Sequence, residues 1–175
     1  MASYDIIPLH QGHGSWSVPD EPLVAIWRRI VAERKVEQLF YAGGIDGPRD
    51  FLAFIKSPQI IACVVLDLES RSPCAIGWLT NAAGGSAFVH YCVLGRPRRA
   101  AGRVLLDYWC NLRGSDGNRM FHVLLGITPE THEAALRVIR IMGFREIGTI
   151  PKYCQCAFEG GRRGAVISYY EVPVD

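Results

Sequence analysis

The chain has 175 residues, of which 49% are hydrophobic and 21% are charged, and its formal net charge is +2. This length favours one domain with one sizeable core over residues 1–175. The small net charge does not by itself indicate a nucleic-acid partner. No apolar run reaches the roughly 18 residues needed to span a bilayer, and no signal peptide is found at the N-terminus. We therefore expect a cytoplasmic protein without a membrane partner.

The cysteines indicate neither a metal site nor a disulfide framework. Six cysteines occur without a Cys-x-x-Cys pair, so the usual spacing of zinc ligands is absent and no metal is expected. Cys63, Cys92 and Cys110 lie in apolar runs, where cysteine behaves as a small hydrophobe. Cys154 and Cys156 would share one face of a strand. Without an export signal, we favour free thiols over disulfides.

The first part of the chain is predicted to contain a short strand and a long helix. The strand covers residues 4–10, and the glycine- and serine-rich segment 11–17 is typical of a loop. Asp20 is suited to cap the helix. From Leu23 onward apolar residues recur at helical spacing, and the pattern continues to Phe40.

The middle of the chain changes from helical to strand periodicity. Asp50 is suited to cap a short helix over residues 51–56. The β-branched and apolar segments that follow are predicted as strands over residues 60–68, 74–80 and 87–94. Because short turns join them, these strands are expected to form an antiparallel meander.

A basic turn of small residues follows the last of these strands. Residues 95–102 read GRPRRAAG and lead into an amphipathic helix. A strand, such a turn and a helix are suited to hold phosphate, because the N–H groups of the turn and the positive end of the helix face the anion. Arginines add charge-assisted hydrogen bonds, and small residues let the backbone approach the phosphate. The alternative is a solvated basic loop.

The last part of the chain predicts a strand, a helix and two closing strands. The strand covers residues 120–127. Residues 128–130 (TPE) are typical of a helix start, with a capping hydroxyl, a proline and a carboxylate favoured by the helix dipole. The closing strands cover residues 145–153 and 165–172. The predicted buried face of the helix comprises Ala135, Val138, Ile139 and Met142.

This order of elements, with a basic turn after the fourth strand, resembles the GNAT superfamily of N-acetyltransferases over nearly the whole chain. The resemblance implies a single GNAT-like domain of the α/β (α+β) class. Its mixed, mostly antiparallel sheet would have about seven strands flanked by about four helices. The resemblance also implies acetyl-coenzyme A (acetyl-CoA) as co-substrate, with its pyrophosphate on the basic turn and its pantetheine along the splayed edge of the fourth strand.

The family turn reads Arg or Gln, two residues, Gly, one residue, then Gly or Ala. Anchored on the apolar pair Leu105-Leu106, it places Pro97, Ala100 and Gly102 at these three positions. Pro97 departs from the pattern because it offers neither a side-chain donor nor an N–H, and neighbouring arginines are expected to compensate. The resemblance thus implies a coenzyme-binding set of Val93, Leu94, Arg96, Arg98, Arg99, Ala100, Ala101, Gly102, Arg103 and His132.

The fourth helix of the family often reads Asn, two residues, Ala, three residues, Tyr, three residues, Gly-Phe. Anchored on Gly143-Phe144, it places Ala135 at the alanine position, His132 where Asn is usual and Ile139 where Tyr is usual. In the family this tyrosine often protonates the departing coenzyme A thiolate, which isoleucine cannot do. Either another donor serves, or the thiolate leaves with help from water.

His90 on the fourth strand is the candidate catalytic base, because an unperturbed imidazole titrates near pH ~6.5. The alternative is that His90 is a structural histidine on a face of the sheet. Strand alternation places His90 and Cys92 on one face and Tyr91 on the other. Cys92 as an acyl-carrying nucleophile is a further alternative. Backbone N–H groups near Val93 and Leu94 are expected to stabilise the developing oxyanion.

We therefore expect an N-acetyltransferase that moves acetyl directly to a small-molecule or peptide amine in a ternary complex, as a monomer or a homodimer. The alternative is a catalytically degenerate module that binds coenzyme A or a partner without turnover, which Pro97, His132 and Ile139 favour. An arginine-driven RNA binder is a third interpretation, but the chain lacks the clustered aromatic platform that single strands need. We therefore expect no nucleic-acid partner.

Overall fold

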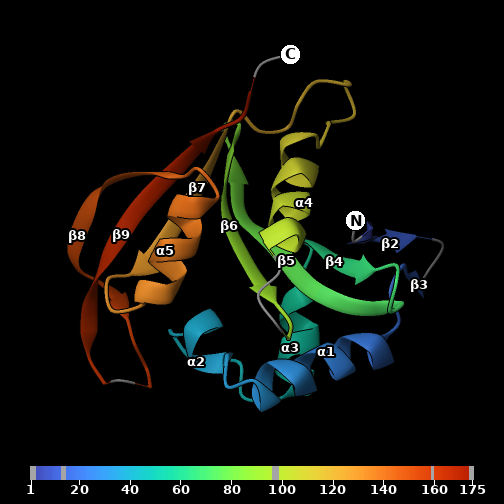
Figure 1. Ribbon diagram of the computed structural model, residues 1–175, viewed down its shortest axis with the longest axis horizontal. Coiled ribbons are helices and arrows are strands. Elements are labelled where there is room, and N and C mark those ends of the chain that lie inside the picture. Colours follow the sequence, from blue (N-terminus) through green and yellow to red (C-terminus); the bar gives the residue numbers. More distant parts are fainter. Residues whose placement is uncertain (1–2, 13–14, 96–98, 159, 174–175) are drawn as a thin grey trace.

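The computed structural model describes residues 3–12, 15–95, 99–158 and 160–173. Seven strands form one sheet in the order β1-β4-β5-β6-β7-β9-β8 (Figure 1). All neighbouring strands are antiparallel except the parallel pair β6 and β7, which confirms the predicted mixed, mostly antiparallel sheet. The strands are β1 (Tyr4–Leu9), β4 (Ile61–Asp67), β5 (Ser72–Ala83), β6 (Ser86–Val93), β7 (Val123–Pro129), β8 (Arg145–Gln155) and β9 (Arg162–Glu171), with a separate hairpin of β2 (Gln11–Gly12) and β3 (Ser15–Trp16).

The helices pack on both faces of this sheet. Within the described residues they are α1 (Asp20–Ala32), α2 (Val36–Leu39), α3 (Pro48–Ile55), α4 (Arg99–Cys110) and α5 (Glu133–Ile141). Helices α1 and α3 share one hydrophobic cluster with Ala62 and Val64 of β4. Helices α4 and α5 share another with Cys63 and Val65 of the same strand. Because successive strand residues point to opposite faces, the two clusters lie on opposite sides of the sheet.

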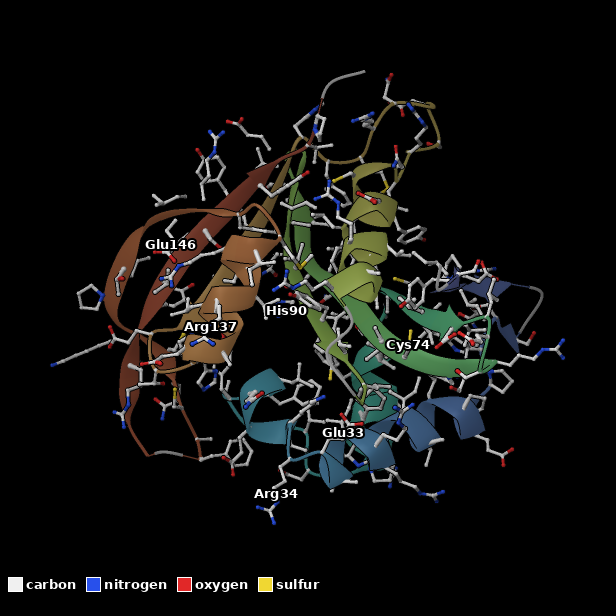
Figure 2. All side chains as sticks on the ribbon, in the orientation of Figure 1. Glu33, Arg34, Cys74, His90, Arg137 and Glu146 are labelled. Carbon is white, nitrogen blue, oxygen red and sulfur yellow. The ribbon has the colours of Figure 1, made fainter. Side chains whose placement is uncertain are left out.

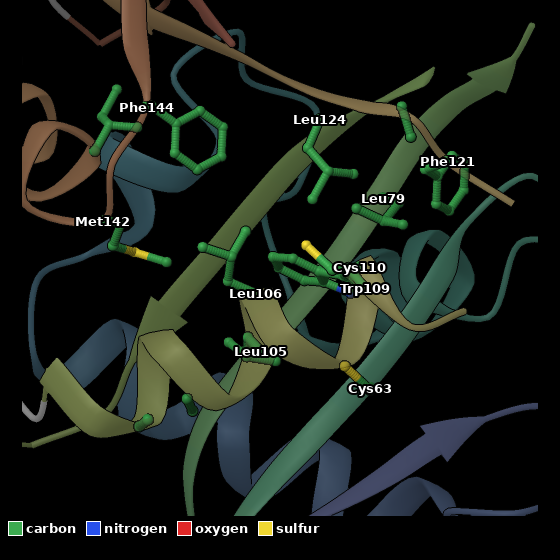
Figure 3. Close-up of a cluster of buried hydrophobic side chains, with 14 of the residues drawn as sticks. Cys63, Leu79, Leu105, Leu106, Trp109, Cys110, Phe121, Leu124, Met142 and Phe144 are labelled. Carbon is green, nitrogen blue, oxygen red and sulfur yellow. The ribbon is translucent and has the colours of Figure 1, made fainter. Parts of the chain in front are cut away.

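The core between α4 and the sheet depends on one glycine. A Cβ on Gly77 of β5 would lie 2.6 Å from the ring of Trp109, so only glycine lets α4 approach this closely. Trp109 and Leu105 are almost fully buried there, and Figure 3 shows them among the side chains of this cluster. All six cysteines are buried free thiols. None of the helices in the described ranges is long and apolar enough to cross a membrane.

The predicted start of α1 is wrong by one residue and that of α3 by three, and one predicted helix is interrupted. Helix α1 has Pro19 at its N-cap and Asp20 as its first residue, while α3 begins at Pro48, before Asp50. In both helices the carboxylate lies in the first turn, where the helix dipole also favours it. The helix predicted to continue to Phe40 breaks at Arg34, whose φ is 55°, and α2 forms a separate turn.

The predicted helix start at residues 128–130 is also wrong. Strand β7 continues to Pro129, which pairs with Ala165 of β9, because a proline is tolerated where a strand ends. Helix α5 starts after His132. Its buried face includes Leu136, which the predicted stripe omits, together with Ile139 and Met142. The other two members of the predicted stripe, Ala135 and Val138, are exposed.

Candidate active site

The site is a gap that opens between β6 and β7. The two strands pair only between Ser86–Phe88 and Val123–Leu125, and Figure 1 shows them diverging beyond this point. Because they are parallel, their carboxyl ends lie at the same edge of the sheet. Helices α4 and α5 begin at this edge, so the positive ends of both helix dipoles flank the mouth of the gap. We call this space the β6–β7 gap.

The backbone of β6 offers hydrogen-bonding groups to the gap. The Leu94 N–H donates to Cys74 O of β5 at 2.7 Å. In an antiparallel pair the bonded residues alternate, so the backbone groups of Tyr91 and Val93 point away from β5, toward the gap. Of the two amides expected to stabilise an oxyanion, the Leu94 amide is therefore already engaged with β5. The Val93 amide has the direction that this role requires.

A charged cluster from the end of α1 holds the carboxyl end of β6 in place. The Gly95 N–H donates to both carboxylate oxygens of Glu33, each at 2.9 Å. Lys35 Nζ lies 2.5 Å from Glu33 Oε2 and 2.6 Å from Val93 O. Arg34, between Glu33 and Lys35, has a left-handed backbone conformation. Figure 2 labels Glu33 and Arg34 after the end of α1. We call this arrangement the Glu33–Lys35 clip.

The clip keeps Glu33 ionised. Burial raises the pKa of this carboxyl, but the hydrogen bonds from Lys35 and Gly95 and the charges of Lys35 and Arg29 outweigh burial and lower it. Sequence reasoning missed the clip, because its members are far apart in the chain and no short motif marks them. The only signal in the sequence was the pair of opposite charges, Glu33 and Lys35, at the end of a predicted helix.

The predicted phosphate turn is described only in part. Arg96, Pro97 and Arg98 lie outside the described residues. Arg99, Ala100 and Arg103 are exposed on the first turns of α4, at the mouth of the gap. Ala101 and Gly102 are buried instead.

Gly102 has a packing role that the sequence did not reveal. A Cβ on Gly102 would lie 3.4 Å from Met142 Sδ and 3.7 Å from Tyr91 Cε2. These contacts place Gly102 beneath the end of α5. The approach of α4 to α5 and β6 therefore leaves room at residue 102 for a side chain no larger than that of alanine, independently of any phosphate.

The start of α5 forms the other wall of the mouth. His132 is its N-cap residue, and the imidazole lies 6.0 Å from the Tyr41 ring at 79°. A cavity of about 390 Å³ separates Gln38 of α2 from residues 131–135 and Arg137 of α5. The backbone of the segment after α2 also accepts a bond from the β8–β9 hairpin, with Ala157 N 2.7 Å from Tyr41 O. The mouth is thus bordered by α2, α4 and α5.

His90 and Cys92 lie on the face of β6 that carries α1 and α3, as strand alternation predicted. The His90 ring stacks on Trp78 at 5.6 Å and 8°, and Nε2 lies 3.0 Å from Thr80 Oγ1. Burial lowers the pKa of His90 to about 4, so its imidazole is neutral at physiological pH and a weaker base than in water. Burial raises the pKa of Cys92 to about 11, which leaves little thiolate for nucleophilic attack.

Tyr91 and Ile139 lie on the opposite face, between β6, α4 and α5. The Tyr91 hydroxyl donates to Met142 Sδ at 2.9 Å, and burial raises the pKa of this phenol. Ile139, at the position where the family often has tyrosine, is buried near Gly126 of β7. Sequence alternation had already separated Tyr91 from His90, but only the structure shows that α4 and α5 share the Tyr91 face.

The solved structures that match this chain in fold include N-acetyltransferases. Ribosomal-protein-S5-alanine acetyltransferase from Vibrio fischeri matches with a TM-score of 0.67 and 16% identity, over 97% of this chain and 93% of that chain. Spermidine N-acetyltransferase from Vibrio cholerae, in complex with CoA and spermine, matches with a TM-score of 0.69 and 11% identity, over 95% of each chain. Aminoglycoside 6'-acetyltransferase type Ii matches with a TM-score of 0.65 and 14% identity, over 98% of this chain and 99% of that chain.

At these identities the likeness establishes the fold. The chain has a GNAT-like fold, which confirms the fold class that the resemblance implied. Neither a family model nor a curated protein matches the sequence itself. Among the described residues, no group of three or more His, Cys, Asp or Glu side chains could hold a metal ion.

Proposed function

We propose that this protein is an acetyl-CoA-dependent N-acetyltransferase that transfers acetyl directly to an amine of a small molecule or peptide. The observation that carries the proposal is the β6–β7 gap, with two helix N-termini at its mouth and backbone donors along its β6 edge. A long, amide-containing thioester with phosphates at one end fits these features, because its amides can pair with β6 and its phosphates can meet the helix ends.

The residues of the gap would divide the work. The first turn of α4 would bind the phosphates, with Arg99 adding positive charge. The Val93 N–H would stabilise negative charge on the acyl oxygen. His90, directly or through water, is the proposed base on the opposite face, although its lowered pKa makes it a weak one.

A coenzyme-binding module without turnover is the second candidate. It is favoured by the buried Ile139 at the position of the family tyrosine and by the lowered pKa of His90. This candidate keeps the coenzyme site and lacks the acid and base. Binding and turnover must therefore be measured separately.

The first experiment measures acetyl-CoA binding as a shift of the unfolding transition. At a ligand concentration a hundredfold above Kd, linkage adds roughly 2.7 kcal/mol to the free energy of unfolding. Arg99→Ala should weaken the binding, whereas Arg28→Ala, on the exposed side of α1, is the matched control. No shift at millimolar acetyl-CoA would refute both candidates.

The second experiment measures thiol release from acetyl-CoA with a panel of amines. Release with any amine supports the enzyme, and release that disappears in His90→Gln supports His90 as the base. If His90→Gln retains the parent rate, the base is water or another group. Tight acetyl-CoA binding without thiol release in the presence of any amine would refute the enzyme and support the non-catalytic module.

A further inference from the structure

A phenol from β6 lies beside the β6–β7 gap. Pairing of β6 with β7 ends at Phe88, so Tyr91 lies beyond the point where the strands part. Its side chain is on the α4–α5 face, where its ring is close to Gly102 of α4 and packs against the hydrophobic cluster that both helices share. The Tyr91 hydroxyl is thereby placed between the two helices that border the gap.

This hydroxyl already donates to a sulfur atom. Its partner is Met142 Sδ, at 2.9 Å. Met142 follows Ile139 by three residues, so the two side chains lie on the same side of α5, and both are buried. Figure 3 shows Met142 directed from the end of α5 toward Leu106 of α4. The Tyr91 phenol of β6 thus lies against the same buried side of α5 as Ile139, whose side chain has no proton to donate.

We propose that Tyr91 is the proton donor to the leaving sulfur in the acetyl transfer, replacing from β6 the donor that Ile139 of α5 lacks. This inference rests on the proposed function. The Tyr91 O–H would exchange its thioether acceptor, Met142 Sδ, for the sulfur of the co-substrate within the gap. Met142 has three side-chain torsions and can move aside to allow this exchange.

The chemistry balances without a further reactant. The neutral amine forms a bond to the acyl carbon, the carbon–sulfur bond breaks and its electron pair stays on sulfur. Tyr91 gives its hydroxyl proton to that sulfur, which yields the thiol. The nitrogen loses one proton, which returns through water to the Tyr91 oxygen. Burial raises the pKa of Tyr91, so the phenol stays protonated at neutral pH but is a weaker acid than a thiol. Its proton therefore passes to sulfur together with the return of the nitrogen's proton to the Tyr91 oxygen, and no free phenolate forms.

The test uses Tyr91→Phe, which keeps the ring and removes only the hydroxyl. Turnover at saturating acetyl-CoA and amine should fall by about 10²-fold or more, while the acetyl-CoA-induced unfolding shift stays that of the parent. The control is Tyr108→Phe, which removes a hydroxyl from a half-buried position on α4 and should keep the parent rate. Full turnover in Tyr91→Phe would overturn the proposal.

A second measurement needs no acceptor. The thiol of bound coenzyme A is titrated by the ultraviolet absorbance of its thiolate, with the complex of desulfo-coenzyme A as blank. A phenol that donates to the thiolate lowers the thiol pKa, so Tyr91→Phe should raise this pKa by about one unit, and Tyr108→Phe should not. An equal thiol pKa in the parent and Tyr91→Phe overturns the assignment. A shifted thiol pKa without thiol release from any amine supports the contact and refutes only the proposed enzyme.

Discussion

The environment of His90 makes the stability of the protein sensitive to acid. Burial against Trp78 lowers its pKa to about 4, whereas the unfolded chain protonates the same imidazole near pH ~6.5. Between these values the unfolded state binds more protons than the folded state, so stability falls as the pH decreases from about 6.5 toward 4. This effect is absent at neutral pH and above.

We expect the His90 contribution to decrease the free energy of unfolding by about 2 kcal/mol between pH 7 and pH 5. Denaturant unfolding of the parent and His90→Gln at both pH values measures it, because glutamine does not titrate and can still bond to Thr80. The parent should lose more stability than the variant. An equal loss in both proteins would show that the His90 pKa is not lowered.

Gly102 provides a prediction about packing at the residue scale. Its missing side chain faces Met142 and Tyr91 at ordinary contact distances, so Gly102→Ala should fold normally. The two γ-methyl groups of valine would enter these side chains, and Gly102→Val should lose about 1–3 kcal/mol of unfolding free energy. Ala100→Val, at an exposed position, is the control and should be close to neutral. A parent-like melting curve for Gly102→Val would place residue 102 outside the core.

At the scale of elements, sequence periodicity predicted the strands well and the helix starts poorly. The segments 60–68, 74–80 and 87–94 are strands in the structure with small changes of boundary, because apolar β-branched runs have few alternatives in a sheet interior. The sequence TPE at residues 128–130 has local features of a helix start, but pairing with β9 extends β7 through Pro129. Local signals cannot anticipate such a long-range pairing.

The same limit applies to the candidate site. The position of the gap followed from the resemblance, and the face shared by His90 and Cys92 followed from strand alternation. The Glu33–Lys35 clip did not, since it joins Glu33 to a residue 62 positions away. The partners of Tyr91 also depend on how α4 and α5 approach each other, which no local pattern encodes.

The clip gives a prediction at the element scale. Glu33→Gln removes the charge that holds Lys35 and weakens the bond to Gly95, so it should lose about 1–2 kcal/mol of unfolding free energy at pH 7. Because the folded pKa of Glu33 is lowered, its contribution is complete above the unfolded pKa and is lost as pH falls through the folded value. The difference between parent and Glu33→Gln should therefore shrink in acid.

The control for the clip is Glu37→Gln, which removes the same charge from an exposed position of α2. Chemical denaturation at pH 7 and pH 3 provides both comparisons. A Glu33→Gln variant that is as stable as Glu37→Gln at pH 7 would mean that the clip does not stabilise the end of β6.

At the scale of the whole molecule, the gap divides the sheet into two parts, β1-β4-β5-β6 and β7-β9-β8. Strands β6 and β7 pair only through three residues each. Across the mouth, the β8–β9 hairpin reaches the segment after α2 through the bond from Ala157 N to Tyr41 O. A ligand in the gap would contact both parts, so it should stabilise them together rather than one at a time.

This arrangement predicts an alternating pattern of amide hydrogen exchange along β6. The amides of His90 and Cys92 face β5 in the ladder, whereas those of Tyr91 and Val93 face the gap. In the free protein, Tyr91 and Val93 should therefore exchange faster than their neighbours. Saturating acetyl-CoA should slow these two amides and those in the first turns of α4 and α5, while β1, on the far edge of the sheet, changes little. NMR measures this exchange residue by residue. Uniform slowing along β6, or slowing confined to α4, would mean that the co-substrate does not occupy the gap.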